Sequence, residues 1–365
     1  MVYRVLGLMS GSALDGLDIV FVEFQENGGK WQYEIIQGET YPYTKEWADK
    51  LRNAIQLKAL DYQLLDVEYG HYIAGEVKKF IDQYKLDFKV QLIASHGHTT
   101  FHVPSKKMTA QLGDGASIAA STGINVVSDL RAIDMALNGH GAPIVPIGEK
   151  LLLNDYDLFL NIGGIMNVSY RKPDEYIAFD VCPANRVMNM MAHKLGKEID
   201  YSGDFARSGK LQPELLQQLN ALDYYSMPYP KSLANDFGTD VIYPMCAKSG
   251  YSIQDGLRTF VEHMAEQLKA SLAALLNGDG GNKRILITGG GAHNSFLIER
   301  LTERLKEINV EVVVPDKVLV DFKEALIMGL IGVLRWREEV NVMATVTGAD
   351  RDSIGGAVWM GQPWN

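Results

Sequence analysis

The stretch YRVLGLMSGSALDGLDIVFVEF, residues 3–24, indicates the fold of this chain. Two apolar runs, residues 3–9 and 17–22, flank a turn of small residues, hydroxyls and carboxylates. Runs of β-branched and aromatic residues bounded by Gly, Ser and Asp predict the two strands of a β-hairpin. In the turn, glycines would let backbone N–H groups approach a phosphate, and Asp15 and Asp18 could hold a magnesium ion through its waters. A plain hairpin explains the stretch equally well, because glycine-rich turns are common.

The composition is that of an ordinary soluble globular protein. The chain has 365 residues, of which 47% are hydrophobic and 22% charged, and its net charge is −10. At about 100–200 residues per domain, this length has room for about two domains. No run of five or more basic residues occurs, so we do not expect nucleic acid as the main partner, because duplex binding depends largely on phosphate neutralisation.

The cysteines and the apolar runs indicate the compartment. Cys182 and Cys246 provide neither a disulfide framework nor a zinc set, and we expect buried thiols in a reducing compartment. No apolar run approaches the ~20 residues of a membrane span. The N-terminus lacks the charged segment and the cleavage site of a signal peptide. We therefore expect a cytoplasmic protein with no membrane partner.

Polar residues follow a short buried strand predicted over residues 90–94. They are Ser95-His96-Gly97-His98, with His102 close behind. Three histidines in seven residues could indicate a metal site, but no acidic ligand is adjacent. We favour polar groups at the C-terminal end of a strand, where open α/β sheets bind ligands.

A carboxylate beside an arginine follows the next predicted strand, residues 124–127. Asp129, Arg131 and Asp134 come just past its end. A carboxylate in this place is a plausible general base. A helix N-cap or a surface ion pair would also explain it.

The opening pattern returns near the middle of the chain. Residues 157–170 predict strand, turn and strand around Asn161-Ile162-Gly163-Gly164, and Gly164 lies 153 residues after Gly11. A third strand is predicted after each hairpin, over residues 31–36 and 176–181, and the second of these carries Asp180 near its end. A chance turn need not recur in the same topological place. Two such hairpins, one per domain, could close on one nucleotide phosphate chain.

A third glycine turn lies nearer the C-terminus. Residues 284–288 predict a strand, followed by Gly289-Gly290-Gly291 and a helix from about Asn294. This order is a generic nucleotide-binding geometry that uses close backbone approach and the helix N-terminal dipole. The turn matches neither a Walker A loop nor G-x-G-x-x-G.

Apolar periodicity predicts the helices and one further strand. We expect helices over residues 44–84, 116–121, 213–222, 252–277 and 323–333, and a strand over 310–314. Ser252 and Asp255 predict a capping box at the start of the fourth of these helices. The apolar segment 323–336 could be an exposed helix at the face of a homodimer, or equally a helix buried between domains.

Several sequence blocks, in the same order over nearly the whole chain, resemble those of the anhydro-N-acetylmuramic acid kinase family, within the actin, hexokinase and Hsp70 superfamily. In this chain the blocks are GLMSGSALDGLD (7–18), SHGHT (95–99), LGDG (112–115), DLRAID (129–134), GHGAP (139–143), NIGGIMN (161–167), FDVCPAN (179–185), GGGAHN (289–294), Glu324-Ala325 and VTGA (346–349). The resemblance implies an α/β fold of two actin-like (ribonuclease H-like) domains with a nucleotide cleft between them. We expect residues 1–128 with 345–365 to form the first domain and 129–344 the second.

The resemblance also implies a reaction. An ATP-dependent kinase would hydrolyse the 1,6-anhydro bond of anhydro-N-acetylmuramic acid and phosphorylate O6, giving N-acetylmuramic acid 6-phosphate and ADP in the recycling of cell-wall sugars. ATP and Mg²⁺ would be the cofactors and an amino sugar the substrate. Two alternatives remain open: a kinase of the same superfamily for another sugar or small acid, and a non-catalytic Hsp70-like ATPase module.

The family's site residues are carried over by their place in the motifs. The implied general base is Asp134. The implied nucleotide-binding residues are Gly11, Ser12, Ala13, Leu14, Asp15, Gly16, Leu17, Asp18, Asn161, Gly163, Gly164, Gly289, Gly290, Gly291 and Asn294. The implied sugar-site residues are Ser95, His96, Asp114, Arg131 and Glu324, and Asp15 and Asp180 are the candidate magnesium ligands.

This chain departs from the family pattern in three places. Ser12-Ala13 replace Thr-Ser in the first loop, which removes one hydroxyl donor at a cost of ~1 kcal/mol if backbone groups remain. His98 and His140 replace glutamines. Val181-Cys182 replace Thr-Gly and add bulk where a glycine allows close approach. These changes are compatible with drift or with a shifted sugar preference.

Overall fold

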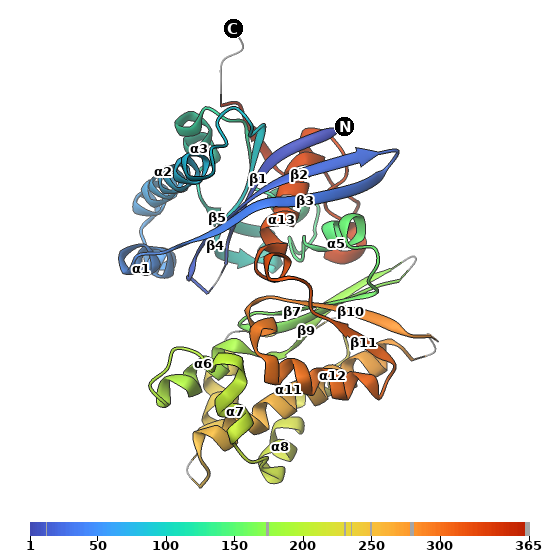
Figure 1. Cartoon of the computed structure of the whole chain (residues 1–365). Helices are drawn as coiled ribbons and strands as arrows, with labels where there is room; N and C mark the ends of the chain where they lie inside the picture. Colours follow the sequence, from blue (N-terminus) through green and yellow to red (C-terminus); the bar gives the residue numbers. More distant parts are fainter. Residues whose placement is uncertain are drawn as a thin grey trace. The chain divides into compact units, whose positions relative to one another are not determined.

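The computed structural model describes residues 1–11, 13–172, 175–229, 231–234, 236–248, 250–277 and 281–361 (Figure 1). The chain divides into two compact units. Unit 1 comprises Met1–Asn154 and Phe322–Asn365, and unit 2 comprises Asp155–Asp321. Each unit has its own sheet and its own apolar core.

The sheet of unit 1 has the strand order β12-β6-β4-β1-β2-β3, with β5 paired to β4. Strands β1 (Val2–Ser10), β2 (Gly16–Asn27) and β3 (Lys30–Pro42) form an antiparallel meander, which confirms the predicted hairpin and third strand. Strand β4 (Leu92–Val103) runs parallel to β1, and β6 (Val126–Ser128) runs parallel to β4.

The sheet of unit 2 repeats this topology with the order β11-β10-β7-β8-β9. Strands β7 (Leu158–Ile162), β8 (Ile165–Arg171) and β9 (Tyr176–Pro183) form the antiparallel meander. Strands β10 (Lys283–Thr288) and β11 (Val310–Val313) continue the sheet in parallel from β7. The predicted repeat is therefore confirmed as a repeat of strand order, with a glycine turn after the first strand of each unit.

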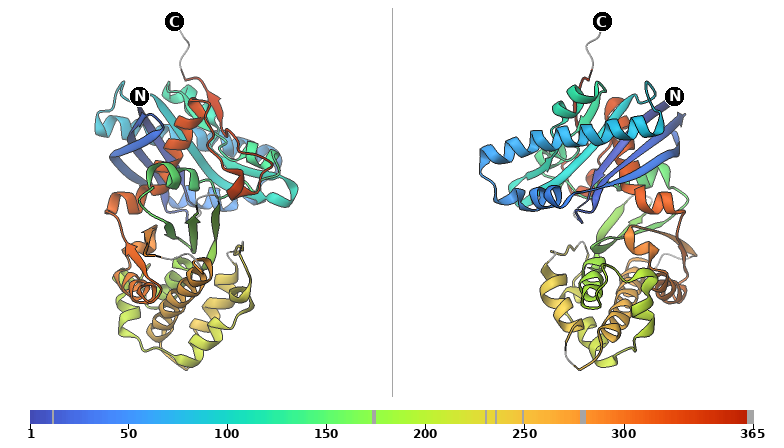
Figure 2. Two further views of the ribbon diagram at one scale, coloured as in Figure 1. Left: turned by 90° about the vertical axis from the view of Figure 1, so that its right-hand side faces the viewer. Right: turned by 60° about the vertical axis from the view of Figure 1, so that its left-hand side comes forward.

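Helices cover both faces of the unit 1 sheet. Alternate residues of a strand face opposite sides, and Leu6 and Leu8 of β1 join the core formed with α2 (Ala59–Tyr84) and α3 (Gly115–Thr122). Gly7 faces the other side, where α13 (Lys317–Trp336) packs so closely that a Cβ on Gly7 would lie 2.0 Å from the carbonyl oxygen of Ala325. Figures 1 and 2 show α2 and α13 on opposite faces of this sheet.

The core of unit 2 forms between its sheet and a layer of helices. The longest of them, α11 (Ile253–Leu275), begins with the predicted capping box of Ser252 and Asp255. Its apolar stripe packs against the sheet and against α12 (Ser295–Lys306).

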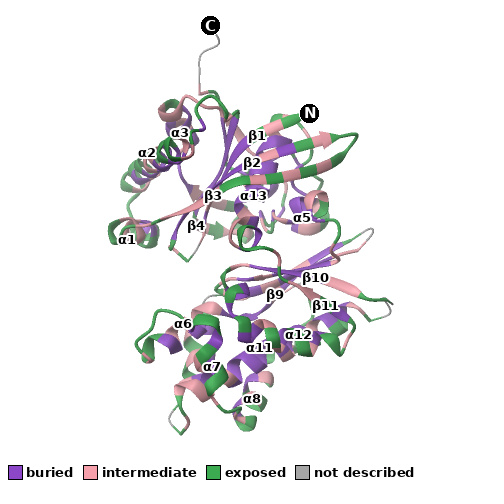
Figure 3. Cartoon of the chain, viewed as in Figure 1, coloured by how far each residue is buried: buried purple, intermediate pink, exposed green. Residues whose placement is uncertain are grey.

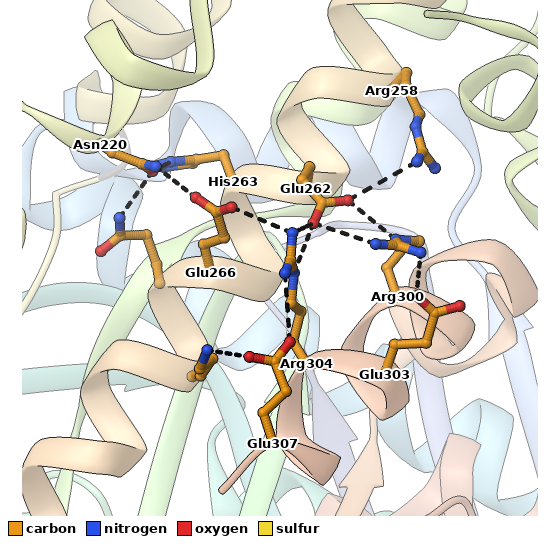
Figure 4. Close-up of polar contacts among 11 residues, drawn as sticks. Asn220, Arg258, Glu262, His263, Glu266, Arg300, Glu303, Arg304 and Glu307 are labelled. Atoms are coloured by element: carbon orange, nitrogen blue, oxygen red, sulfur yellow. Dashed lines mark hydrogen bonds and ion pairs between the residues drawn. The ribbon is translucent and has the colours of Figure 1, made fainter. Parts of the chain in front are cut away.

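An ion network joins α11 to α12 on this layer (Figure 4). The side chain of Glu262 is 1% exposed and accepts hydrogen bonds from Arg300 Nε at 3.0 Å and from Arg304 Nε at 2.8 Å. Arg258 forms a longer ion pair with Glu262, at 3.9 Å. A buried carboxylate is tolerated here because several guanidinium donors surround it.

The remaining elements connect these layers. Those in unit 1 are α1 (Lys45–Asn53), β5 (Met108–Leu112), α4 (Ala132–Ala136), α5 (Pro146–Leu152), α14 (Ala344–Thr347) and β12 (Ala357–Trp359). Those in unit 2 are α6 (Asn185–Lys194), α7 (Asp204–Ser208), α8 (Pro213–Asn220), α9 (Asp223–Ser226), a π-helix (Phe237–Ile242) and α10 (Tyr243–Cys246). In the part of the chain that the structure describes, no helix is long and apolar enough to cross a membrane.

The division into units differs from the predicted boundaries at 128/129 and 344/345. Residues 129–154 and 322–344 pack with unit 1. Helix α5 shows why, because a Cβ on Gly148 would lie 2.5 Å from the side chain of Ile327 in α13. Close packing between segments far apart in sequence sets the boundary.

Helix α13 also differs from the prediction. It begins at Lys317, six residues before the predicted start, after Asp316 accepts a hydrogen bond from the Leu319 N–H at 2.9 Å. From Ala325 to Leu334 the helix is largely buried in unit 1 (Figure 3). The burial of this helix therefore does not support the suggestion that residues 323–336 form an exposed dimer face.

Candidate functional site

The first candidate loop follows β1 in unit 1. Gly11 has open space around it: no described atom outside its chain neighbours lies within 4 Å of a Cβ built there, and its φ is not positive. Neither packing nor backbone strain therefore requires glycine at this position, whereas the close approach of a ligand would. Ala13 and Asp15 are exposed, and Asp15 Oδ1 accepts the Gly16 N–H at 3.0 Å. Ser12 lies outside the described residues.

The last residues of the predicted loop belong to β2. A Cβ on Gly16 would meet the carbonyl oxygen of Tyr41 at 2.7 Å, so the pairing of β2 with β3 explains this glycine. Leu17 is buried in the unit 1 core, and Leu14 is half-buried against it. Asp18 Oδ1 accepts a hydrogen bond from the Thr40 hydroxyl at 2.6 Å. Among the described residues, the open part of the loop is thus Gly11, Ala13 and Asp15.

A directional chain of hydrogen bonds holds Ser10 immediately before this loop. The Tyr43 hydroxyl donates to Ser10 Oγ at 2.7 Å, and the Ser10 hydroxyl lies 3.0 Å from His98 Nδ1. Burial lowers the pKa of His98 to about 4, so the ring is neutral at pH 7. Because the only proton of Tyr43 goes to Ser10, the hydroxyl of Tyr69, 2.5 Å away, donates to Tyr43.

The ring tautomer decides the direction of the hydrogen bond between Ser10 and His98. Ser10 Oγ accepts the Tyr43 hydroxyl; it donates to His98 Nδ1 when the ring proton is on Nε2, and accepts from Nδ1–H when the ring proton is on Nδ1. An amide in place of His98 could also accept from Ser10 or donate to it, which accounts for glutamine and histidine serving at the same position.

His96 has a different partner from His98, because the positive φ of Gly97 (71°) breaks the alternation of β4 between them. His96 Nε2 accepts from Arg131 Nε at 2.8 Å, and its Nδ1 lies 2.9 Å from the carbonyl oxygen of Gly97. Burial, together with the charge of Arg131, lowers the pKa of His96 to about 3. His96 is therefore a neutral acceptor that orients the guanidinium.

Asp134 is the most enclosed carboxylate among the predicted site residues. It is 0% exposed and belongs to the short helix α4, so it is neither a surface ion pair nor a helix cap. Its Oδ1 accepts the Thr347 hydroxyl at 2.6 Å, and its Oδ2 accepts the Gly141 N–H at 2.7 Å. The carbonyl of Gly141 accepts from Arg131 Nη1 at 2.6 Å. Gly141 thus contacts Arg131 through its carbonyl oxygen and Asp134 through its N–H.

The other residues predicted near the sugar differ in whether their side chains have a structural partner. Asp114 caps α3 by accepting the Ser117 N–H at 2.8 Å. Ser95 Oγ is buried and has no hydrogen-bond partner among the described residues. Burial raises the pKa of Glu324, while the charges of Lys323 and Arg131 oppose this shift. Lys323 itself forms a buried ion pair with Glu149 at 3.0 Å.

Unit 2 brings together two of the predicted nucleotide loops. Strands β7 and β10 are parallel neighbours with Asn161 opposite Thr288, so the turns that follow them lie side by side. A Cβ on Gly289 would lie 2.5 Å from Asn161 Oδ1, and a Cβ on Gly291 would lie 2.2 Å from Ile162 Cγ2. These two glycines are required by the contact between the loops.

Gly163 and Gly164, by contrast, have only ordinary or distant neighbours. The nearest described atoms to a Cβ at these positions lie 3.7 Å and 4.0 Å away, respectively, and neither residue has a positive φ. Like Gly11 in unit 1, these two glycines leave the backbone accessible, and no packing contact with the described residues requires glycine at either position. Gly290 also has space, with Asn185 Nδ2 at 3.5 Å.

Four further residues in unit 2 are held by structural contacts. Asn294 caps α12 by accepting the Leu297 N–H at 3.0 Å. Asp180 Oδ2 accepts the Leu233 N–H at 2.9 Å, and burial raises the pKa of Asp180. Val181 and Cys182 are buried in the apolar core.

Sequence reasoning did not single out Ser10, Tyr43, Gly141 or Thr347. The family blocks could have identified two of these residues, since Gly141 lies in the GHGAP block and Thr347 in the VTGA block. Among the residues described, no group of three or more His, Cys, Asp or Glu side chains is arranged to hold a metal ion.

The repeated strand order, with a glycine turn after the first strand of each unit, defines an actin-like α/β protein of two units. The family model described as "Anhydro-N-acetylmuramic acid kinase" matches residues 3–361. Relatives with this name from Hydrogenovibrio crunogenus and Aliivibrio fischeri are each 33% identical, covering 97% and 98% of this chain and 97% and 99% of theirs. The chain therefore belongs to the anhydro-N-acetylmuramic acid kinase family, and it is a kinase.

Among solved structures, the chain is similar to component A of (R)-2-hydroxyglutaryl-CoA dehydratase from Acidaminococcus fermentans. The sequence identity is 16% and the TM-score 0.44, over 90% of this chain and 97% of that chain.

Proposed function

We propose that this protein uses ATP to hydrolyse the 1,6-anhydro bond of anhydro-N-acetylmuramic acid and to phosphorylate O6, in the recycling of cell-wall sugars in the cytoplasm. The observation that carries the proposal is the placement of Asp134. It is a fully buried carboxylate with one donor on each oxygen, tied through Gly141 to Arg131. Membership of the family supports the choice of sugar.

In the proposed step, Asp134 takes one proton from a water molecule. The water oxygen bonds to the anomeric carbon, and the bond between that carbon and O6 breaks. O6 keeps the electron pair and attacks the γ-phosphorus of ATP, and ADP leaves. General-base catalysis by a positioned carboxylate contributes ~10²–10⁴-fold to the rate.

The remaining groups would bind and orient the sugar and the phosphates. Arg131, held by His96 and Gly141, would present the rest of its guanidinium to an anionic or polar group of the sugar. The open glycines at 11, 163 and 164 would offer backbone N–H groups to the phosphates. Ser95 Oγ would give its unused hydroxyl to the sugar.

Magnesium ions in kinases are held by one or two carboxylates together with the phosphates. Asp15 fits this role, because it is exposed and, among the described residues, only its Oδ1 accepts a hydrogen bond, from the Gly16 N–H. Asp180 fits less well, since its Oδ2 already accepts the Leu233 N–H. When bound, the ion would neutralise charge on the phosphates.

The test replaces the base while keeping its shape. Asp134→Asn should reduce ADP release with anhydro-N-acetylmuramic acid by ~10²–10⁴-fold and leave ATP binding, measured by calorimetry, within about twofold of wild type. Glucose serves as the control sugar. Wild-type turnover with glucose but none with the anhydro sugar would contradict the proposal.

A further inference from the structure

Thr347 follows Asp134 by 213 positions, yet its hydroxyl donates to Asp134 Oδ1 at 2.6 Å. Thr347 is 1% exposed and Asp134 is 0% exposed, so no bulk water competes for this hydrogen bond. The hydroxyl also lies 3.4 Å from the carbonyl oxygen of Met343, a much longer contact. The single proton of Thr347 is therefore committed to the carboxylate.

The backbone around Thr347 is held by other contacts. The carbonyl oxygen of Thr347 accepts the His140 N–H at 2.9 Å, and the Asp350 N–H donates to the carbonyl oxygen of Leu137 at 2.9 Å. The side chain of Asn138 donates to Asp350 Oδ2 at 2.5 Å. Removal of the Thr347 hydroxyl would thus leave this segment anchored to the loop around Asp134.

The contacts around Asp134 also fix how the carboxylate is turned. A Cβ on Gly139 would lie 2.1 Å from Asp134 Oδ2, so backbone lies directly against that oxygen, and Gly141 N–H donates to it at 2.7 Å. Among the described residues, only the Thr347 hydroxyl engages Oδ1 through a side chain. Loss of the hydroxyl would therefore affect the orientation of the carboxylate.

We propose that Thr347 is a positioning residue for the reaction, whose hydroxyl orients Asp134 to take the proton of the attacking water. The inference rests on the proposed role of Asp134.

The experiment compares Thr347→Val, which replaces the hydroxyl with a methyl group of similar size, with Thr347→Ser, which keeps it. For Thr347→Val we expect kcat to fall about 10-fold, as for the loss of a hydrogen bond to a charged group, while the KM values for sugar and ATP change less than about twofold. Thr347→Ser should restore kcat and keep both KM values near those of wild type.

Thr302→Val is the matched control, because it removes a hydroxyl that bonds only within α12 of unit 2. It should change neither kcat nor the KM values. If Thr347→Val does not fold, Thr347→Ala replaces it in the same comparison with serine.

Unchanged kcat in Thr347→Val, or a serine variant as impaired as the valine variant, would overturn the inference. An active Asp134→Asn enzyme would instead overturn the proposed role of Asp134 itself. The two failures are therefore distinguishable.

Discussion

His98→Gln should make unit 1 less sensitive to acid without weakening it at neutral pH. In the folded protein, His98 is 6% exposed, its Nδ1 lies 3.0 Å from the Ser10 hydroxyl, and burial lowers its pKa to about 4. In the unfolded chain a histidine titrates near its ordinary value of about 6.5. As pH falls below that value, the unfolded state binds a proton that the folded state does not, so stability is lost toward acid.

The size of the effect follows from these two values. Between pH 7.5 and pH 5.5, one such histidine lowers the free energy of unfolding by about 1.3 kcal/mol. Glutamine can accept from Ser10 through its side-chain carbonyl and does not titrate. We therefore expect His98→Gln to lie within about 1 kcal/mol of wild type at pH 7.5 and to lose about 1.3 kcal/mol less on acidification.

Urea unfolding followed by tryptophan fluorescence is suited to this measurement. The tryptophans of the described residues, Trp31, Trp47, Trp336 and Trp359, all belong to unit 1, so the signal follows that unit. His193→Gln, at an exposed position of α6, is the control and should retain the wild-type pH dependence.

A third variant separates the hydrogen bond from the titration. His98→Leu leaves the Ser10 hydroxyl without this hydrogen-bond partner and should cost ~1–3 kcal/mol at pH 7.5. If His98→Gln loses stability with acid as steeply as wild type, or if His98→Leu is as stable as His98→Gln at pH 7.5, the proposed chain of hydrogen bonds is refuted.

Further predictions concern unit 2. Glu262→Gln should lower its unfolding free energy by ~3 kcal/mol, because three guanidinium groups lose a buried carboxylate; Glu303→Gln, whose carboxylate is 54% exposed, should cost under ~1 kcal/mol. Both are measured by urea unfolding with far-UV circular dichroism, and equal losses would contradict the reasoning. Gly163→Ala should fold normally but weaken ATP binding at least ~10-fold in calorimetry. Gly291→Ala should destabilise the fold, since its Cβ would clash with Ile162. If Gly163→Ala destabilises the fold and Gly291→Ala folds normally, the inference that the backbone at Gly163 is open would be contradicted.

The sequence was sufficient to predict the repeated hairpins. Each hairpin depends on local signals, namely apolar runs of β-branched residues and a turn of Gly, Ser or Asp. The same holds for the capping box at Ser252, whose residues are neighbours in sequence. The N-cap role of Asn294 could also have been predicted from the sequence, because Asn before a helix is a strong capping residue.

Features that depend on distant packing could not be predicted in the same way. The unit boundaries follow from contacts such as Gly148 with Ile327, which no local pattern reveals. The partners of the site residues are similarly remote, since Ser10 and His98 are 88 positions apart and Asp134 and Thr347 are 213 positions apart. Motif resemblance selected Asp134, Arg131 and His96, but only the structure shows which atoms of these side chains meet.

The distinction among the glycines also depends on the three-dimensional structure. In the sequence, the glycines at 11, 16, 163, 289 and 291 look alike as members of glycine-rich turns. In the structure, Gly16, Gly289 and Gly291 are explained by close contacts within the protein, whereas Gly11 and Gly163 are not. The second group is therefore where we expect a ligand to approach the backbone.

The most direct test of the proposed reaction is to follow oxygen from isotopically labelled water into the product. Wild-type protein is incubated with ATP and anhydro-N-acetylmuramic acid in labelled water, and the sugar phosphate is analysed by mass spectrometry with fragmentation. We predict that the product gains one phosphate group and one water, with the label on the anomeric carbon and an unlabelled oxygen at O6. A product that gains a phosphate group without water, or that carries the label in the phosphate, would contradict the account.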